Sequence, residues 1–213
     1  MNCDAIARHY AWIEFAAFGK TLQRCRFHFL DQLTDTRRAL VLGDGDGRFL
    51  VELLRACPQV SVDYVDRSAA MLALARQRAG SDRVRYHHAD VLTEALPGVE
   101  SGAEYDLVVT HFFLDCFAAH ELASVIRRVG SVAAKDARWV ISEFRIPPGR
   151  LFAIFARRFI GLMYAFFRWA TGLRTTELSD HRPLLTGAGF VLRLQTERAG
   201  GLLASELWQR PVE

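Results

Sequence analysis

The sequence predicts an α/β fold in which helices cover both faces of a doubly wound, mostly parallel sheet. Apolar runs that suit strands alternate with segments of helical spacing along the 213 residues, and this alternation favours a parallel sheet. The first apolar run leads directly into a turn that contains three glycines. A composition of 51% hydrophobic and 24% charged residues suits one globular domain with a continuous core.

Residues 1–36 are expected to form one or two helices, because apolar side chains recur there at spacings of three and four. His9, Tyr10 and Trp12 are either packing residues or the lining of a pocket. The chain begins without a basic and apolar leader. We therefore expect a cytoplasmic protein without a secretory signal.

The stretch around which the chain is organised begins with a strand expected over residues 39–42, a continuous apolar run typical of a central strand. Gly43, Gly45 and Gly47 follow, with Asp44 between the first two. Glycines at these positions let the backbone bend sharply and approach a ligand where a Cβ would collide. Apolar residues at helical spacing come next, so free N–H groups of a helix should face the turn.

A second strand is expected over residues 60–65, and it ends in Asp66. A carboxylate at the tip of this strand can accept hydrogen bonds from both hydroxyls of a ribose. Ser68 suits the N-cap of the next helix, which is expected to run through Arg78.

Two further strands should deliver polar residues to the same edge of the sheet. One begins at Val84 and exits at Asp90, and the other runs from residue 105 and delivers Thr110, His111 and Asp115. Ligands of open α/β sheets lie at the carboxyl ends of the strands. These side chains are therefore expected near the glycine turn.

The rest of the chain continues the alternation. A helix is expected over residues 120–132 and a strand over 139–144.

The spacing of the three glycines separates two classes of ligand. A dinucleotide site requires G-x-G-x-x-G, whereas Gly43, Gly45 and Gly47 give G-x-G-x-G, which resembles motif I of class I S-adenosyl-L-methionine (SAM)-dependent methyltransferases. The resemblance implies a Rossmann-like, seven-stranded sheet, with its last helix within residues 178–190 and its last two strands over 191–195 and 202–208. Such enzymes usually carry an acidic residue where this chain has Val41, so either Asp44 or Asp46 substitutes for it or SAM binds more weakly.

The resemblance also implies SAM as the cofactor and S-adenosyl-L-homocysteine (SAH) as its product. It places Asp66 on the ribose, Met71 against the adenine and Asp90 on the adenine amino group, with Ala89 and Val91 flanking the ring. The full set of expected cofactor contacts is Gly43, Asp44, Gly45, Gly47, Asp66, Arg67, Met71, Asp90, Val91 and Thr110.

Methyl transfer by in-line displacement needs little covalent work from a protein, because the sulfonium is already activated. A base is needed only for a protonated acceptor, and the ordinary pKa of histidine suits His111 to be that base or to position the acceptor. Tyr164, Glu143 and Asp115 are weaker candidates.

Four regions are expected: a helical cap at 1–36, a SAM-binding core at 37–145, an aromatic acceptor region at 146–176, and a C-terminal helix with the last two strands at 177–213. The tail, which includes Ala188-Gly189-Phe190, resembles the branch that methylates quinones and related molecules. That resemblance implies a small lipophilic or aromatic acceptor.

Residues 151–170 are rich in aromatic and aliphatic side chains. Arg157, Arg158 and Arg168 interrupt them, so the segment is too short to cross a membrane. Three interpretations stay open: burial against the sheet, lining of an acceptor pocket, or peripheral contact with a membrane surface through arginines at the headgroups.

Other ligand classes find less support in the sequence. A net charge of +3 is too weak to indicate nucleic acid. The four cysteines form no C-x-x-C pair, and His87 and His88 are adjacent on a strand and so point to opposite faces. We expect no metal site, and the sequence predicts no oligomeric state.

Two other functions remain open at this stage. A nicotinamide-dependent oxidoreductase would share Asp66 but should have the longer glycine spacing. A non-catalytic SAM-binding or RNA-interacting module is compatible with Val41 in place of the usual acid.

Overall fold

The computed structural model describes residues 4, 18–99, 102, 104–173, 175–176 and 178–211. His9, Tyr10 and Trp12, the candidate pocket residues of the N-terminal region, lie outside the described residues. The described part begins with helix α2 (Thr21–Arg26) and a short 3-10 turn, η2 (Leu30–Gln32).

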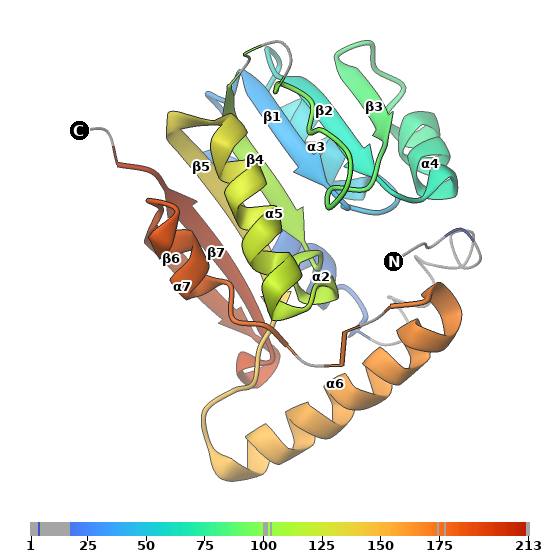
Figure 1. Cartoon of the computed structure of the whole chain (residues 1–213), viewed down its shortest axis with the longest axis vertical. Helices are drawn as coiled ribbons and strands as arrows, with labels where there is room; N and C mark the ends of the chain where they lie inside the picture. Colours follow the sequence, from blue (N-terminus) through green and yellow to red (C-terminus); the bar gives the residue numbers. More distant parts are fainter. Residues whose placement is uncertain are drawn as a thin grey trace.

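Seven strands form one sheet in the order β3-β2-β1-β4-β5-β7-β6 (Figure 1). Only β7 runs antiparallel to its neighbours, β5 and β6. The strands are β1 (Arg38–Leu42), β2 (Ser61–Asp66), β3 (Val84–His88), β4 (Tyr105–His111), β5 (Ala133–Phe144), β6 (Val191–Arg198) and β7 (Leu203–Gln209). The predicted doubly wound, mostly parallel, seven-stranded sheet is confirmed. The strand order reverses between β1 and β4, where open α/β sheets bind ligands.

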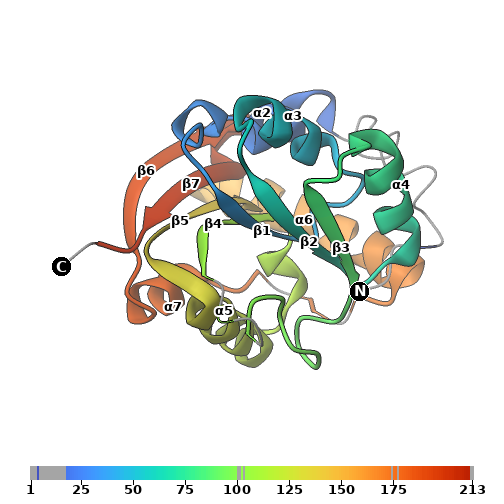
Figure 2. The same ribbon diagram turned by 90° about the horizontal axis from the view of Figure 1, so that it is seen from above.

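Helices cover both faces of this sheet (Figure 2). Helices α2, α3 and α4 lie on one side, and α5 and α7 lie on the other. Their bounds are α3 (Arg48–Ala56), α4 (Ala69–Ala79), α5 (Ala119–Val132), α6 (Arg150–Thr171) and α7 (Arg182–Gly187), with short 3-10 turns η3 (Leu114–Cys116) and η4 (Ala199–Gly201).

Strand β1 shows why its apolar residues are continuous. Leu40 and Leu42 belong to the core beneath α5, whereas Ala39 and Val41 belong to the core beneath α3. All four side chains are fully buried. A strand covered on both faces has no position for a solvated side chain, as its sequence predicts.

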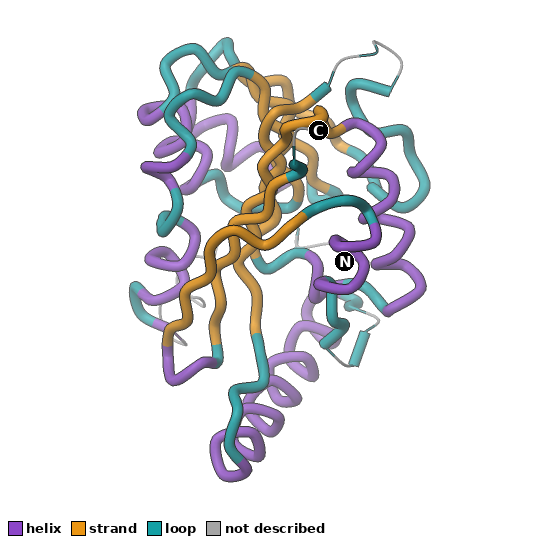
Figure 3. Tube along the Cα trace, turned by 90° about the vertical axis from the view of Figure 1, so that its left-hand side faces the viewer, coloured by secondary structure: helices purple, strands orange, loops and turns teal. Residues whose placement is uncertain are grey.

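Helix α6 lies apart from these two layers. Figure 1 places it beyond the carboxyl ends of the parallel strands, and Figure 3 shows it at the lower end of the molecule. Its buried residues, such as Ile160 and Tyr164, form a third core with Phe144 and Leu203. None of the helices in the described part of the chain has the length and hydropathy that a membrane span requires.

Three boundaries differ from the sequence-based expectation. Strand β5 begins at Ala133 rather than Trp139, because Ala133 pairs with Tyr105 of β4 ahead of a register shift, and regular pairing continues from Arg138. Helix α7 covers only Arg182–Gly187, with Pro183 in its first turn, where the fixed φ of proline favours a helix start. Strand β6 runs on to Arg198 because it pairs with β7 over its whole length.

Candidate active site

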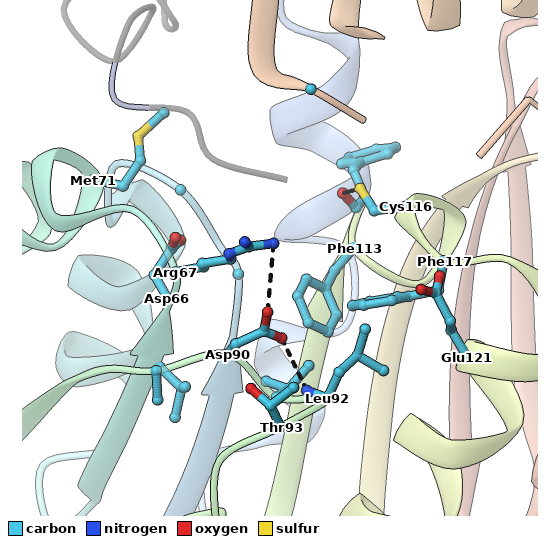
Figure 4. A pocket seen from close by; sticks show the side chains of 17 residues that line it. Asp66, Arg67, Met71, Asp90, Leu92, Thr93, Phe113, Cys116, Phe117 and Glu121 are labelled. Carbon is cyan, nitrogen blue, oxygen red and sulfur yellow. Dashed lines mark hydrogen bonds and ion pairs between the residues drawn. The ribbon is translucent and has the colours of Figure 1, made fainter. Parts of the chain in front are cut away.

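A cavity of about 420 Å³ opens at the carboxyl ends of β1 to β4 (Figure 4). This volume is within the range of roughly 300–1,000 Å³ that is typical of small-molecule sites. Its lining residues are Gly43, Gly45, Val65, Asp66, Arg67, Met71, Ala89, Asp90, Val91, Leu92, Thr93, Phe112, Phe113, Cys116, Phe117, Glu121 and Gly172. Residues far apart in the sequence therefore meet at the switch point of the sheet.

The glycine turn is fixed from the second strand. The backbone N–H of Gly43 donates to the carbonyl of Val65 at 2.9 Å, and the Tyr64 hydroxyl donates to the carbonyl of Gly45 at 2.8 Å. Gly43, Gly45 and Gly47 have φ values of 60°, 74° and 78°. This left-handed backbone explains why glycine stands at all three positions.

Gly47 does not line the cavity and instead seats the turn on α4. A Cβ built on Gly47 would lie 2.8 Å from the Cα of Ala75. Because backbone atoms on a packed helix cannot move aside cheaply, only glycine permits this approach. The role of Gly47 in the structure is therefore close packing.

The aromatic ring of Phe113 covers the first glycine. A Cβ on Gly43 would lie 2.2 Å from the ring carbon Cδ2 of Phe113. Its neighbour Phe112 has a φ of 53°, which is uncommon for a residue with a side chain. The segment after β4 thus folds back over the glycine turn.

Asp66 lies where β2 ends, as expected. Its Oδ1 accepts a hydrogen bond from the Ser68 N–H at 2.7 Å, and burial, with Asp44 nearby, raises the pKa of Asp66 to about 6. The Ser68 hydroxyl accepts from the Met71 N–H at 3.2 Å, which confirms Ser68 as the N-cap of α4. This cap fixes Met71 at the cavity wall.

Asp90 faces Arg67 at the cavity wall (Figure 4). Its Oδ2 lies 3.4 Å from Nη1 of Arg67, and its Oδ1 accepts from the Leu92 N–H at 3.0 Å. Carboxylates from the ends of two different strands, Asp66 and Asp90, thus line the same cavity. Val91, the other residue expected beside the adenine, lines it as well.

Asp44 and Asp46 differ in their surroundings. Asp46 forms ion pairs with Arg48 at 2.8 Å and Arg78 at 3.1 Å, and these tie the turn to α3 and α4. Asp44 Oδ1 lies 3.0 Å from Nδ1 of His111, while its buried Oδ2 has no hydrogen-bond partner among the described groups. Of the two acids, Asp44 retains an acceptor beside the glycines that line the cavity.

Thr110 and His111 lie behind the cavity rather than in its lining. The Thr110 hydroxyl accepts from the Trp139 indole N–H at 2.9 Å. The fully buried His111 ring packs edge-on against Phe49 at 4.5 Å, and burial lowers the pKa of His111. Strand β4 continues through His111, so both side chains are still within the layers of the sheet.

The weaker candidates Asp115, Glu143 and Tyr164 also lie outside the lining and support the loop after β4. Glu143 Oε1 accepts from the N–H groups of Phe113 at 3.1 Å and Leu114 at 2.8 Å. The Tyr164 hydroxyl donates to the Asp115 carbonyl at 3.1 Å. Burial raises the pKa of Asp115 to about 6 and that of its neighbour Glu143 well above its ordinary value.

Sequence reasoning missed most of the lining that follows β4. Phe112, Phe113, Cys116 and Phe117 line the cavity, and Glu121 lines it while accepting from the Ala118 N–H at 3.1 Å. The available signal was that aromatic residues directly follow the polar strand end at the ligand edge. The lining begins one residue after the strand ends.

No group of three or more metal-ligating side chains is found within the ranges that the structure describes. The adjacent histidines have separate partners. His87 Nε2 lies 2.7 Å from Asp63 Oδ1, and His88 Nε2 lies 3.0 Å from the Arg67 carbonyl.

Comparisons of the sequence with known proteins agree with this site. Residues 39–136 match the family described as "Methyltransferase domain". A demethylmenaquinone methyltransferase from Deinococcus radiodurans is 32% identical over 118 residues, which are 54% of this chain and 46% of the relative. The chain thus spans about half the length of that curated relative.

Solved structures share the fold at low sequence identity. An O-methyltransferase family 2 protein from Planctomyces limnophilus, solved with apigenin, is 16% identical with a TM-score of 0.69, over 96% of this chain and 62% of that one. The N-methyltransferase NodS from Bradyrhizobium japonicum, solved with SAH, is 14% identical with a TM-score of 0.61, over 90% of this chain and 85% of that one.

The domain match covers the glycine turn, Asp66 and Asp90, which the structure places around one cavity. The sheet order and the solved structures agree with that match. Residues 39–136 are therefore similar to a methyltransferase domain, and the chain shares the fold of the solved methyltransferases.

Proposed function

We propose that this protein is an enzyme that transfers a methyl group from SAM to a small lipophilic or aromatic acceptor by in-line displacement. One observation carries the proposal. The left-handed turn at Gly43 and Gly45, the carboxylate of Asp66 and the carboxylate of Asp90 all line the same cavity at the switch point of the sheet. The match to the methyltransferase domain family supports it.

The residues present suit this cofactor. Asp66 can accept from both ribose hydroxyls, and Asp90 can accept from the adenine amino group. The orphaned Oδ2 of Asp44 beside the turn is an acceptor for the ammonium group of the methionine end. When bound, the cofactor supplies a methyl group on an activated sulfonium.

For His111 we propose a role through Asp44 rather than direct contact with the acceptor. The ring is fully buried, and its Nδ1 lies 3.0 Å from Asp44 Oδ1. This contact fixes the carboxylate next to the turn. Val41 occupies the position of the usual acid and is buried in the core. We therefore assign the cofactor-binding role of that acid to Asp44.

The acceptor is expected on the aromatic side of the cavity. Phe113 and Phe117 line that side, opposite Asp66 and Met71 in Figure 4. Aromatic walls favour a flat apolar acceptor and exclude water from the reacting centre. The demethylmenaquinone methyltransferase among the relatives supports an acceptor of this class.

Calorimetry with SAH, followed by turnover with SAM, tests the proposal. Asp66→Asn and Asp90→Asn should each weaken binding about ten- to a hundredfold, since a hydrogen bond to a charged group contributes roughly 1.5–3 kcal/mol. Asp136→Asn is the matched control, because Asp136 is exposed in the first half of β5, away from the carboxyl edge.

Mass spectrometry then follows methylation across a panel of quinols, phenols and amines. The proposal fails if the wild-type protein binds neither SAM nor SAH. Saturable binding without a methylated product on the whole panel would favour a non-catalytic SAM-binding module instead.

A further inference from the structure

Helix α6 has an inner face that belongs to the protein core and an outer face that does not. Ala156, Ile160 and Tyr164 are buried and recur every four residues. Through them the helix packs on Phe144 and the core around Leu203. Packing in the protein core therefore accounts for the apolar residues of the inner face.

The outer face is apolar over the whole length of the helix. Its exposed members include Phe155 at 67%, Leu162 at 73% and Trp169 at 85% of their full accessible area. Together with Phe152 and Phe166 they recur at spacings of three, seven, four and three, which are helical spacings that place all five on one side of the helix. Six of the ten exposed large hydrophobic side chains of the described chain lie on this helix. We call the five residues 152, 155, 162, 166 and 169 the apolar stripe.

The charges on α6 are all of one sign. Arg150, Arg157, Arg158 and Arg168 are exposed, and the helix contains no aspartate or glutamate. Arg150, Arg157 and Arg168 are separated by seven and eleven residues, which places them on one line along the helix. At about 100° per residue, Arg158 lies between this basic line and the apolar stripe, and both are on the exposed side of the helix.

Exposed large apolar side chains that gather on one face often mark an interaction surface. Helices with a large apolar face, aromatic side chains and arginines lie in the plane of a membrane interface. Guanidinium groups pair with phosphate in a bidentate manner. A second copy of the chain fits less well, because a two-fold contact would gather the arginines of both helices with no acidic residue on α6 to pair them.

We propose that α6 lies on the surface of a lipid bilayer that carries anionic headgroups. The apolar stripe enters the boundary between headgroups and acyl chains, and the four arginines contact lipid phosphates. This inference concerns the outer face and is independent of the proposed reaction.

The contact would also bring the cavity close to the bilayer. Tyr164 on the inner face donates to the carbonyl of Asp115, within η3, whose neighbours Phe113 and Phe117 line the cavity. Gly172, directly after α6, lines it as well. A lipophilic molecule dissolved in the membrane would reach the cavity without crossing bulk water.

Flotation of the full chain with vesicles tests the proposal. Wild-type protein should bind vesicles of phosphatidylcholine with 30% phosphatidylglycerol at least tenfold more tightly than phosphatidylcholine alone, and added salt should weaken binding. Leu162→Ser with Trp169→Ser should abolish binding. Val191→Ser with Leu194→Ser is the matched control, since both residues are exposed at 45% on β6.

Charge is tested in the same way. Arg157→Glu with Arg168→Glu should weaken binding to the anionic vesicles at least tenfold, whereas Arg193→Glu on β6 should not. Trp169 fluorescence should shift to shorter wavelength with vesicles. Circular dichroism and thermal melting confirm that each variant is folded.

Three outcomes would overturn the proposal. These are no binding to anionic vesicles, equal binding by the stripe variant and its β6 control, or a stable dimer by light scattering that Trp169→Ser dissociates. The last result would show that a second copy covers the stripe.

Discussion

Replacing Gly47 by alanine tests how tightly the glycine turn is seated on α4. The added Cβ would lie 2.8 Å from both the Cα and the Cβ of Ala75, and φ at Gly47 is 78°. The left-handed backbone costs an L-residue about 1–2 kcal/mol, and overpacking against atoms that cannot move costs about 1–3 kcal/mol more. We therefore expect Gly47→Ala to lower the free energy of unfolding by about 2–5 kcal/mol.

Gly80→Ala is the matched control for this experiment. Gly80 also has a positive φ, 52°, but a Cβ there would meet nothing within 4 Å. Gly80→Ala should therefore lose only the stability that the left-handed backbone costs, about 1–2 kcal/mol. Alanine also lowers the conformational entropy of the unfolded chain, and this effect is the same in both variants. Urea denaturation followed by circular dichroism measures the difference. Equal losses for the two variants would refute the packing argument.

Three other predictions follow from the site. Because the folded-state pKa of Asp115 is about 6 against an ordinary 3.8, ionisation of Asp115 destabilises the fold increasingly as the pH rises from about 4 to 6, and the cost is constant above that. Asp115→Asn should therefore raise the free energy of unfolding at pH 8 by up to about 3 kcal/mol and leave it unchanged at pH 4, by urea melts at both values. Ser68→Ala removes the hydroxyl that accepts from the Met71 N–H and should cost about 1 kcal/mol in the same melts; no loss would mean that the cap contributes nothing. The affinity for SAH should fall as the pH drops through the Asp66 pKa of about 6, because a protonated carboxyl loses acceptor capacity. Calorimetry at pH 5 and 7.5 measures this, and Asp66→Asn should show no such dependence.

Strands β1 and β4 could be predicted from the sequence because their side chains are buried on both faces. The apolar run before Gly43 corresponds to β1, and Asp66 ends β2 as expected. The first half of β5 could not be found in this way, since Lys135 and Asp136 are exposed. Its start is set by the pairing of Ala133 with Tyr105 of β4, which no local pattern encodes.

The site residues of the glycine turn and of the β2 and β3 ends could be predicted from the sequence. Those after β4 could not, because they depend on the residue at which β4 ends. Asp66 ends β2, Met71 lies in the first turn of α4 and Asp90 follows β3, and all three line the cavity. Thr110 and His111 do not, because β4 runs on through them. The part of the cavity lining that follows β4 begins at Phe112, where a left-handed φ of 53° changes the direction of the chain. Because the end of β4 was uncertain by one residue, the sequence predicted the buried His111 in place of Phe112, which lines the cavity.

The segment between β5 and β6, which contains α6, packs separately from the glycine turn. Helix α6 joins only the core around Phe144 and Leu203, whereas β1 and its glycine turn rest on two other cores. Substitutions in α6 should therefore disturb the two cores around the glycine turn less than substitutions in β1 do.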